Sequence, residues 1–278
     1  MDDDAAINAG FRDAATAVIS SDRLRVEVDA AAGGRLSSLR ADGHEILVTG
    51  TPVDDPMRWG SFPMVPWAGR VSAGRFVFDG TVVQLPLGLP PHAIHGTGYV
   101  RPWTITDRTD HSVSLLASLG PDWPFAAEAR QEVLVDGARL CLTLEVHALE
   151  QQMPAMVGWH PWFRRQVGEG APLELEFAAA EMYARDDAGI PNGKIGAPPA
   201  GPWDDCFRAV TGGPVLRWPG LGALHLRSSC DHWVVYDEPE HALCVEPQSD
   251  APDAFNRSPH LVRPGQPLVE EFELRWER

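Results

Sequence analysis

An all-β fold, arranged as an antiparallel sandwich or barrel, is predicted by three features of this chain. Short segments alternate between apolar and polar residues, which is the period of a half-buried strand. Turn-forming residues separate these segments, with 26 glycines and 25 prolines in 278 residues. Long stretches with helical periodicity are hard to find. Short alternating strands joined by turns are typical of antiparallel sheets packed face to face.

The strands can be followed along the chain by their alternating apolar residues. The segment 139–147 is the clearest case, since Leu140, Leu142, Leu144 and Val146 share one face. The same pattern occurs at 24–28, 173–177 and 272–276. Phe76 and Phe78 run into Asp79-Gly80, a dipeptide that favours a tight hairpin turn.

The length and lack of internal repeats predict one domain over residues 18–278. Residues 1–17 form an alanine-rich acidic stretch, for which we expect a short helix or a frayed tail. The N-terminus lacks the basic and apolar regions of a signal peptide, and no apolar run is long enough to cross a membrane. The cysteines are scattered without a Cys-x-x-Cys pair, which favours reduced thiols in a cytoplasmic protein: Cys141, Cys206, Cys230 and Cys244.

The net charge of −16 restricts the partners of the chain. A strongly acidic protein is poorly suited to bind nucleic acid or an anionic membrane, and it gives no help in binding a phosphorylated substrate. A neutral small molecule is the partner that this charge favours.

Two reactive side chains stand directly before prolines. His160 precedes Pro161, and Glu246 follows an apolar run and precedes Pro247. Because proline disfavours continuation of a β-ladder, we expect both side chains where a strand leaves its sheet, at a rim rather than in the core. An imidazole and a carboxylate in such positions are suited to act as general acid and general base. The carboxylate is expected to hold a proton on the histidine at neutral pH.

Three further polar clusters add candidates. Arg70 ends a proline-punctuated apolar stretch, His92 and His95 stand in Pro91-His-Ala-Ile-His-Gly96, and the 203–207 segment carries Asp204 and Asp205. Taken singly, each has an ordinary structural role, as a surface ion pair, a loop cap or a turn residue. Their function therefore depends on their combination.

The combination resembles the aldose 1-epimerase (galactose mutarotase-like) family, over nearly the whole chain from Arg23 to Trp276. The most specific motif is Val-Glu-Pro-Gln at 245–248 followed by Pro-Asp-Ala-Phe-Asn at 252–256. The segment 62–70 with Gly-Arg-Phe at 74–76, His95-Gly96, His160-Pro161 and Asp204-x-x-Phe207 complete the set in family order.

This resemblance implies an antiparallel β-supersandwich enzyme that interconverts the α and β anomers of a free aldose such as galactose or glucose. It implies Glu246 as the base that takes the proton of the C1 hydroxyl and His160 as the acid that protonates the ring oxygen. Arg70 and His95 would hold the sugar. Asp204 would accept hydrogen bonds from its hydroxyls, and it is preferred to Asp205 because it lies three residues before the phenylalanine. No cofactor or metal is expected, and the enzyme would be a monomer or a homodimer.

The chain also departs from the family pattern, and other functions stay open. Gly69 stands where many members carry an asparagine, which bears on the choice of sugar. A hexose-6-phosphate 1-epimerase would need converging arginines, for which the candidates are Arg58, Arg70, Arg75 and Arg101. A non-catalytic sugar-binding protein would keep the fold without turnover. A metal-dependent isomerase would use His92, His95, His160 and Glu246 as ligands. A glycosidase would pair Glu246 with Asp204 and leave His160 without a role.

Overall fold

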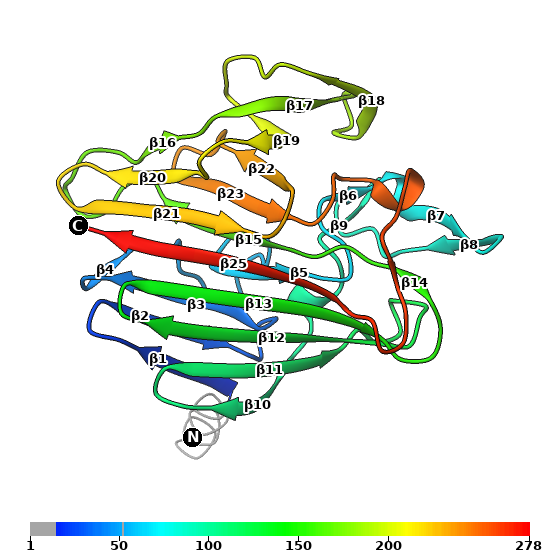
Figure 1. The fold of residues 1–278 in the computed structure, drawn as a ribbon, viewed down its shortest axis with the longest axis horizontal. Coiled ribbons are helices and arrows are strands. Elements are labelled where there is room, and N and C mark those ends of the chain that lie inside the picture. Colours follow the sequence, from blue (N-terminus) through cyan, green and yellow to red (C-terminus); the bar gives the residue numbers. More distant parts are fainter. Residues whose placement is uncertain (1–14, 52) are drawn as a thin grey trace.

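A computed structural model describes residues 15–51 and 53–278, which form two large antiparallel sheets and three two-stranded ones (Figure 1). The first sheet runs, in spatial order, through β1 (Thr16–Ser20), β2 (Leu24–Asp29), β3 (Arg35–Ala41), β5 (Ser61–Met64), β15 (Gly158–Arg164), β23 (Ala242–Gln248), β22 (His232–Tyr236), β19 (Asp204–Val210), β17 (Ala179–Arg185) and β18 (Pro191–Gly196), with β4 (His44–Glu45) beside β3. The second runs through β10 (Thr104–Arg108), β11 (Ser112–Ser118), β12 (Ala127–Asp136), β13 (Arg139–Ala148), β25 (Leu268–Glu277), β21 (Gly222–Ser228), β20 (Val215–Trp218) and β16 (Glu174–Glu176).

The smaller strand pairs lie at one end of these sheets (Figure 1). They are the pairs β6 (Arg70–Val71) with β9 (Ala93–Ile94), β7 (Arg75–Phe78) with β8 (Thr81–Gln84) and β14 (Met153–Pro154) with β24 (Leu261–Val262). Three 3-10 turns complete the described elements: η1 (Ser72–Gly74), η2 (Gly98–Val100) and η3 (Ala254–Asn256). The predicted all-β antiparallel fold is therefore confirmed.

The alternating segments form strands as predicted. In β13 the apolar set Leu140, Leu142, Leu144 and Val146 is buried, while the intervening residues are partly exposed. The hairpin predicted at Asp79-Gly80 joins β7 to β8, and both residues have positive φ, at 49° and 74°. Two successive positive φ angles are the geometry that a tight hairpin turn requires.

The N-terminal prediction needs one correction. Residues 1–14 lie outside the described part of the chain, but Thr16 and Ala17 belong to β1 and pair with Asp29 and Val28. Ala17 is fully buried, so hydrophobic burial extends the first strand two residues into the segment expected to be a tail or helix. Residues 15–51 and 53–278 contain no helix long and apolar enough to span a membrane. The four cysteines, all within this part, form no disulfide.

The contacts of Trp159, which precedes His160 on β15, show which face of this strand carries the functional candidates. The indole Nε1 of Trp159 donates to Gln131 Oε1 on β12 at 3.1 Å, across the interface between the two sheets. The Trp159 ring also packs 5.7 Å from the ring of Phe272 on β25. Since successive strand residues point to opposite faces, His160 must point away from the second sheet. The first sheet thus has a free face available for a binding site.

A second contact between the sheets leads to a stability prediction. Asp42 binds Arg23 through both carboxylate oxygens, at 2.5 and 2.8 Å, and accepts from Trp276 Nε1 on β25 at 2.9 Å. Chiefly through Arg23, these bonds lower the pKa of Asp42 to about 2. A lowered pKa stabilises the folded state above the ordinary carboxyl pKa, and this contribution is lost as the pH falls toward 2.

We therefore expect Asp42→Asn to lower the free energy of unfolding by about 1 kcal/mol at pH 7, a modest value because the pair is partly solvated. The difference from the unaltered protein should shrink as denaturant unfolding is repeated down to pH 2. The exposed Asp107, which makes no ion pair among the described residues, supplies the control Asp107→Asn. An Asp42→Asn deficit that stays constant with pH would contradict this role.

Candidate active site

The two residues expected to be acid and base lie opposite each other on adjacent central strands. The β15–β23 register pairs Gly158 with Gln248 and Trp162 with Cys244, so His160 and Glu246 occupy facing positions. The distance from His160 Nε2 to Glu246 Oε1 is 3.3 Å. Residues that face each other on one side of a sheet have neighbouring side chains, so the register itself assembles this pair.

The prediction that both residues lie at strand exits is wrong. His160 is inside the seven-residue β15 and Glu246 inside the seven-residue β23, and their exposed fractions are only 5% and 2%. The prolines interrupt pairing only between these two strands: Pro161 still pairs with Ser61 on β5, and Pro247 with Trp233 on β22. Because each strand is held from its other side, it continues through its proline.

Aromatic rings hold the imidazole of His160 in place. Phe62, which faces His160 on β5, stacks on it with ring centres 4.8 Å apart, and Trp162 stacks on its other side at 5.2 Å. His95 meets the same imidazole edge-on at 5.0 Å. The ring of His160 therefore lies in an aromatic stack that limits its rotation.

His95 reaches the site from a strained backbone position just after β9. Its φ is 58°, which is uncommon for a residue with a side chain, and its amide donates to Gly69 O at 3.1 Å. The next residue, Gly96, has no room for a side chain, because a Cβ there would lie 1.8 Å from Val65 O. Strain held by its surroundings in this way is common where a side chain must be aimed at a ligand.

A chain of alternating charges forms one wall of the site. Arg70 Nη2 lies 3.2 Å from Asp204 Oδ2, the same oxygen lies 3.6 Å from Arg185 Nη1, and Arg185 Nε lies 2.8 Å from Asp205 Oδ1. Both aspartates predicted from the sequence are present, at the start of β19. Arg185, at the end of β17, was not predicted, and its sequence context carries no signal that would have found it.

Gln248 provides the hydrogen bond to the second carboxylate oxygen of Glu246. Its Nε2 donates to Glu246 Oε2 at 3.2 Å, and the glutamine is fully buried. A residue two positions after Glu246 on a strand must share its face. That spacing was visible in the Val-Glu-Pro-Gln motif and was a missed signal.

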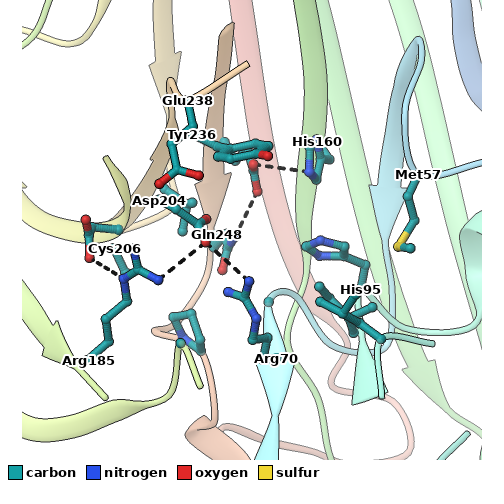
Figure 2. Close-up of a pocket in the computed structure, with 18 of the residues that line it drawn as sticks. Met57, Arg70, His95, His160, Arg185, Asp204, Cys206, Tyr236, Glu238 and Gln248 are labelled. Carbon is teal, nitrogen blue, oxygen red and sulfur yellow. Dashed lines mark hydrogen bonds and ion pairs between the residues drawn. The ribbon is translucent and has the colours of Figure 1, made fainter. Parts of the chain in front are cut away.

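These residues surround a cavity of about 330 Å³ on the free face of the first sheet (Figure 2). The lining includes all five residues predicted to act on the sugar: Arg70, His95, His160, Asp204 and Glu246. Figure 2 shows His160, His95, Arg70 and Asp204 turned toward one shared space. Further lining residues that the sequence did not single out include Met57, Tyr236, Glu238 and Gln248. The volume lies at the small end of ligand sites, roughly 300–1,000 Å³, and fits a single small molecule.

Burial changes the expected protonation of the pair. It lowers the pKa of His160 to about 3, and it raises the pKa of Glu246 well above its ordinary value, with Asp204 adding to the rise. The expectation that the carboxylate holds the proton on His160 is therefore corrected, because desolvation opposes both charged forms. A proton shared by the pair is therefore held by the Glu246 carboxyl in preference to the His160 imidazole. Burial also lowers the pKa of His95, which is neutral at pH 7.

Gly69, for which the family resemblance implied an asparagine, packs closely against a proline. Gly69 has φ of 66°, and a Cβ at this position would lie 2.8 Å from Pro252 Cγ. Gly69 and Pro252 both line the cavity, so this part of the wall is apolar and lacks a side-chain amide. Gly69 therefore changes the wall of the cavity beside Pro252, and the atoms nearest to it do not include the His160–Glu246 pair.

The metal-ligand set considered from the sequence is not assembled. His92 is absent from the cavity lining, and its Nδ1 accepts a hydrogen bond from the amide of Ala73 at 3.1 Å. Arg75 and Arg101 are also absent from that lining, and Arg101 pairs with Asp122 at 2.6 Å.

The sequence model of the family described as aldose 1-epimerase matches residues 18–245. The chain belongs to the aldose 1-epimerase family. The match ends one residue before Glu246, so the assignment of this residue depends on the geometry of the site.

Two uncharacterized relatives come from Escherichia coli K12. YphB is 26% identical over 242 residues, with 78% of this chain and 83% of YphB covered. YihR is 28% identical over 166 residues, and the match spans 57% of this chain and only 54% of YihR.

Solved structures of this family share the fold. A galactose mutarotase-like protein from Clostridium acetobutylicum superposes with a TM-score of 0.84 at 16% identity, covering 94% of both chains. A galactose 1-epimerase from Lactobacillus acidophilus NCFM gives a TM-score of 0.79 at 16% identity, again with 94% of each chain covered. The predicted galactose mutarotase-like supersandwich is thereby confirmed.

Proposed function

We propose that this protein is an aldose 1-epimerase that interconverts the α and β anomers of a free aldose. The observation that carries the proposal is the His160–Glu246 pair, 3.3 Å apart in a cavity that also holds Arg70, His95 and Asp204. Ring opening of a hemiacetal removes a proton from O1 while another arrives at O5, and these two oxygens share the anomeric carbon. An acid and a base in near contact can therefore serve both oxygens.

The reaction follows from the position of this pair. Glu246, as carboxylate, takes the proton from the C1 hydroxyl, and His160, as imidazolium, protonates the ring oxygen as the C1–O5 bond breaks. The product is an open-chain aldehyde, which rotates about C1–C2 and presents its other face. The ring oxygen then attacks, His160 takes its proton back, and Glu246 returns a proton to O1.

The pair can reach its active protonation state without exchanging a proton with solvent. In the resting state the shared proton lies on Glu246, and transfer to His160 across 3.3 Å produces the carboxylate and imidazolium together. The net charge of the pair is the same before and after. A sugar whose hydroxyls contact both groups would replace lost hydration and favour the charged form.

The charged wall and His95 are proposed to bind the sugar. Asp204 can accept hydrogen bonds from ring hydroxyls, and Arg70 and neutral His95 can bind its oxygens. Trp162 also lines the cavity and can contact the apolar side of a pyranose. Because Glu246 contacts His160 directly, this scheme gives the histidine a role that a two-carboxylate glycosidase would not.

A hexose-6-phosphate 1-epimerase is the second candidate, because three arginines line the cavity: Arg58, Arg70 and Arg185. Each of them already has a carboxylate partner, namely Asp55 at 3.1 Å, Asp204 at 3.2 Å and Asp205 at 2.8 Å. A phosphate would have to compete with these carboxylates and with the nearby Glu238. The local charge therefore favours an uncharged sugar.

Mutarotation of freshly dissolved anomers, followed by polarimetry and proton NMR, tests this proposal. We expect equilibration of α-galactose or α-glucose to be accelerated in proportion to enzyme concentration, with the 6-phosphates accelerated less. Faster equilibration of a 6-phosphate would favour the second candidate. Saturable sugar binding with no acceleration of any aldose would show a sugar-binding protein without turnover.

A further inference from the structure

Cys244 is a buried thiol beside the acid–base pair that the proposed reaction does not use. It lies on β23 two residues before Glu246 and is fully buried. The strand period turns it to the same face as Glu246, and the register sets it opposite Trp162, two residues after His160. A sulfur, a nitrogen and a carboxylate oxygen thus face one another on one side of a sheet.

The geometry of this group resembles a three-ligand metal site. The ligand atoms of His160, Cys244 and Glu246 all lie within 4.8 Å of one another. Zinc bonds of about 2.0–2.3 Å in tetrahedral geometry set neighbouring ligand atoms roughly 3.3–3.6 Å apart. The His160–Glu246 distance of 3.3 Å already meets this requirement, so only the thiol needs to approach.

We propose that His160, Cys244 and Glu246 form a site for a thiophilic divalent cation such as Zn²⁺, which inhibits the enzyme by occupying its acid and base. The binding depends only on these ligands, whereas the inhibition depends on the proposed epimerase function. His160 and Glu246 line the cavity, so a fourth coordination position can face it and take water or a sugar oxygen. An imidazole, a thiolate and a carboxylate are a ligand set that suits Zn²⁺ and does not suit Mg²⁺.

Coordination changes the protonation of the ligands in a defined way. The thiol must lose its proton, which passes to the buffer, and a cation supplies the charge that makes a buried thiolate acceptable. A proton shared by Glu246 and His160 must leave as well, because both offer lone pairs to the metal. The metal-bound enzyme then has neither a base free for O1 nor an acid for O5.

Calorimetric titration of tag-free protein with Zn²⁺, compared for the unaltered chain, Cys244→Ala and Cys230→Ala, tests the site. Cys230 is a buried thiol outside the three-residue group and serves as the matched control. We expect one Zn²⁺ per chain, with affinity weakened at least about tenfold in Cys244→Ala and unchanged in Cys230→Ala. Co²⁺ should give a thiolate-to-cobalt absorption band that disappears in Cys244→Ala only.

The mutarotation assay adds the second readout. Zn²⁺ should inhibit the unaltered enzyme and Cys230→Ala, EDTA should restore activity, and Mg²⁺ should have no effect. Cys244→Ala should keep its activity at Zn²⁺ concentrations that stop the unaltered enzyme. Equal Zn²⁺ affinity with and without Cys244, or no binding at all, would overturn the site. Specific binding to a protein that catalyses no mutarotation would leave the site standing and remove the proposed function.

Discussion

Replacing Glu246 by glutamine should lower kcat for mutarotation by about 10²–10⁴, the usual contribution of a positioned base. This corresponds to roughly 2.7–5.4 kcal/mol of activation free energy. Glutamine keeps the shape of the side chain but cannot take the O1 proton. Since burial raises the pKa of Glu246, an uncharged amide should be tolerated there, and the thermal midpoint should not fall. Polarimetry and a melting curve of the same sample measure both effects.

The pH dependence of kcat/KM gives a second test of Glu246 as the base. The singly protonated pair is the active form, so kcat/KM should fall on the alkaline side as the shared proton is lost, and the raised pKa of Glu246 places this fall at a higher pH than an ordinary carboxyl would give. Because His160 and Glu246 are in contact, the apparent pKa belongs to the pair. Glu246→Gln should lose this alkaline limb.

A matched control exists on the second sheet, where Glu145 Oε2 lies 2.6 Å from His147 Nε2 on β13, and neither residue lines the cavity. Glu145→Gln should leave both the rate and its pH profile unchanged. A Glu246→Gln enzyme within tenfold of the unaltered rate would exclude Glu246 as the base.

The local pattern of apolar and polar residues was sufficient to predict the strands, because it depends on residues that are close in sequence. The alternation in 139–147 and the Asp79-Gly80 turn predicted β13 and the β7–β8 hairpin with their buried faces. The order of the strands was not predictable in this way. The neighbours of β15 are β5 and β23, which come from opposite ends of the chain and whose registers depend on long-range packing.

The candidate site was predicted as a set of residues but not as a geometry. Motifs in family order identified Arg70, His95, His160, Asp204 and Glu246, and the cavity brings them together. The prediction that His160 and Glu246 lie at strand exits was wrong. The proline after each residue interrupts pairing between β15 and β23, while each strand stays paired to its other neighbour. Their protonation was also wrong, since it depends on burial, which a sequence does not give.

The second large effect is expected for His160. In His160→Ala the proton donor to O5 is lost, and kcat should fall by about 10²–10⁴ while sugar binding is less affected. The substitution also leaves a gap between Phe62 and Trp162, which stack on the imidazole, so a loss of stability of about 1–3 kcal/mol is expected as well. Stability and catalysis must therefore be separated.

The variant His160→Phe separates the effect on stability from the effect on catalysis. It keeps an aromatic ring between Phe62 and Trp162 but removes both nitrogens, so it should recover much of the melting temperature without recovering the rate. The control His147→Ala removes the histidine of the pair on β13 and should leave mutarotation unchanged. If His160→Phe restored turnover together with stability, His160 would be a packing residue. Since the His160 imidazole is the one that contacts Glu246, at 3.3 Å, and phenylalanine cannot carry a proton to the ring oxygen, we expect stability and rate to separate.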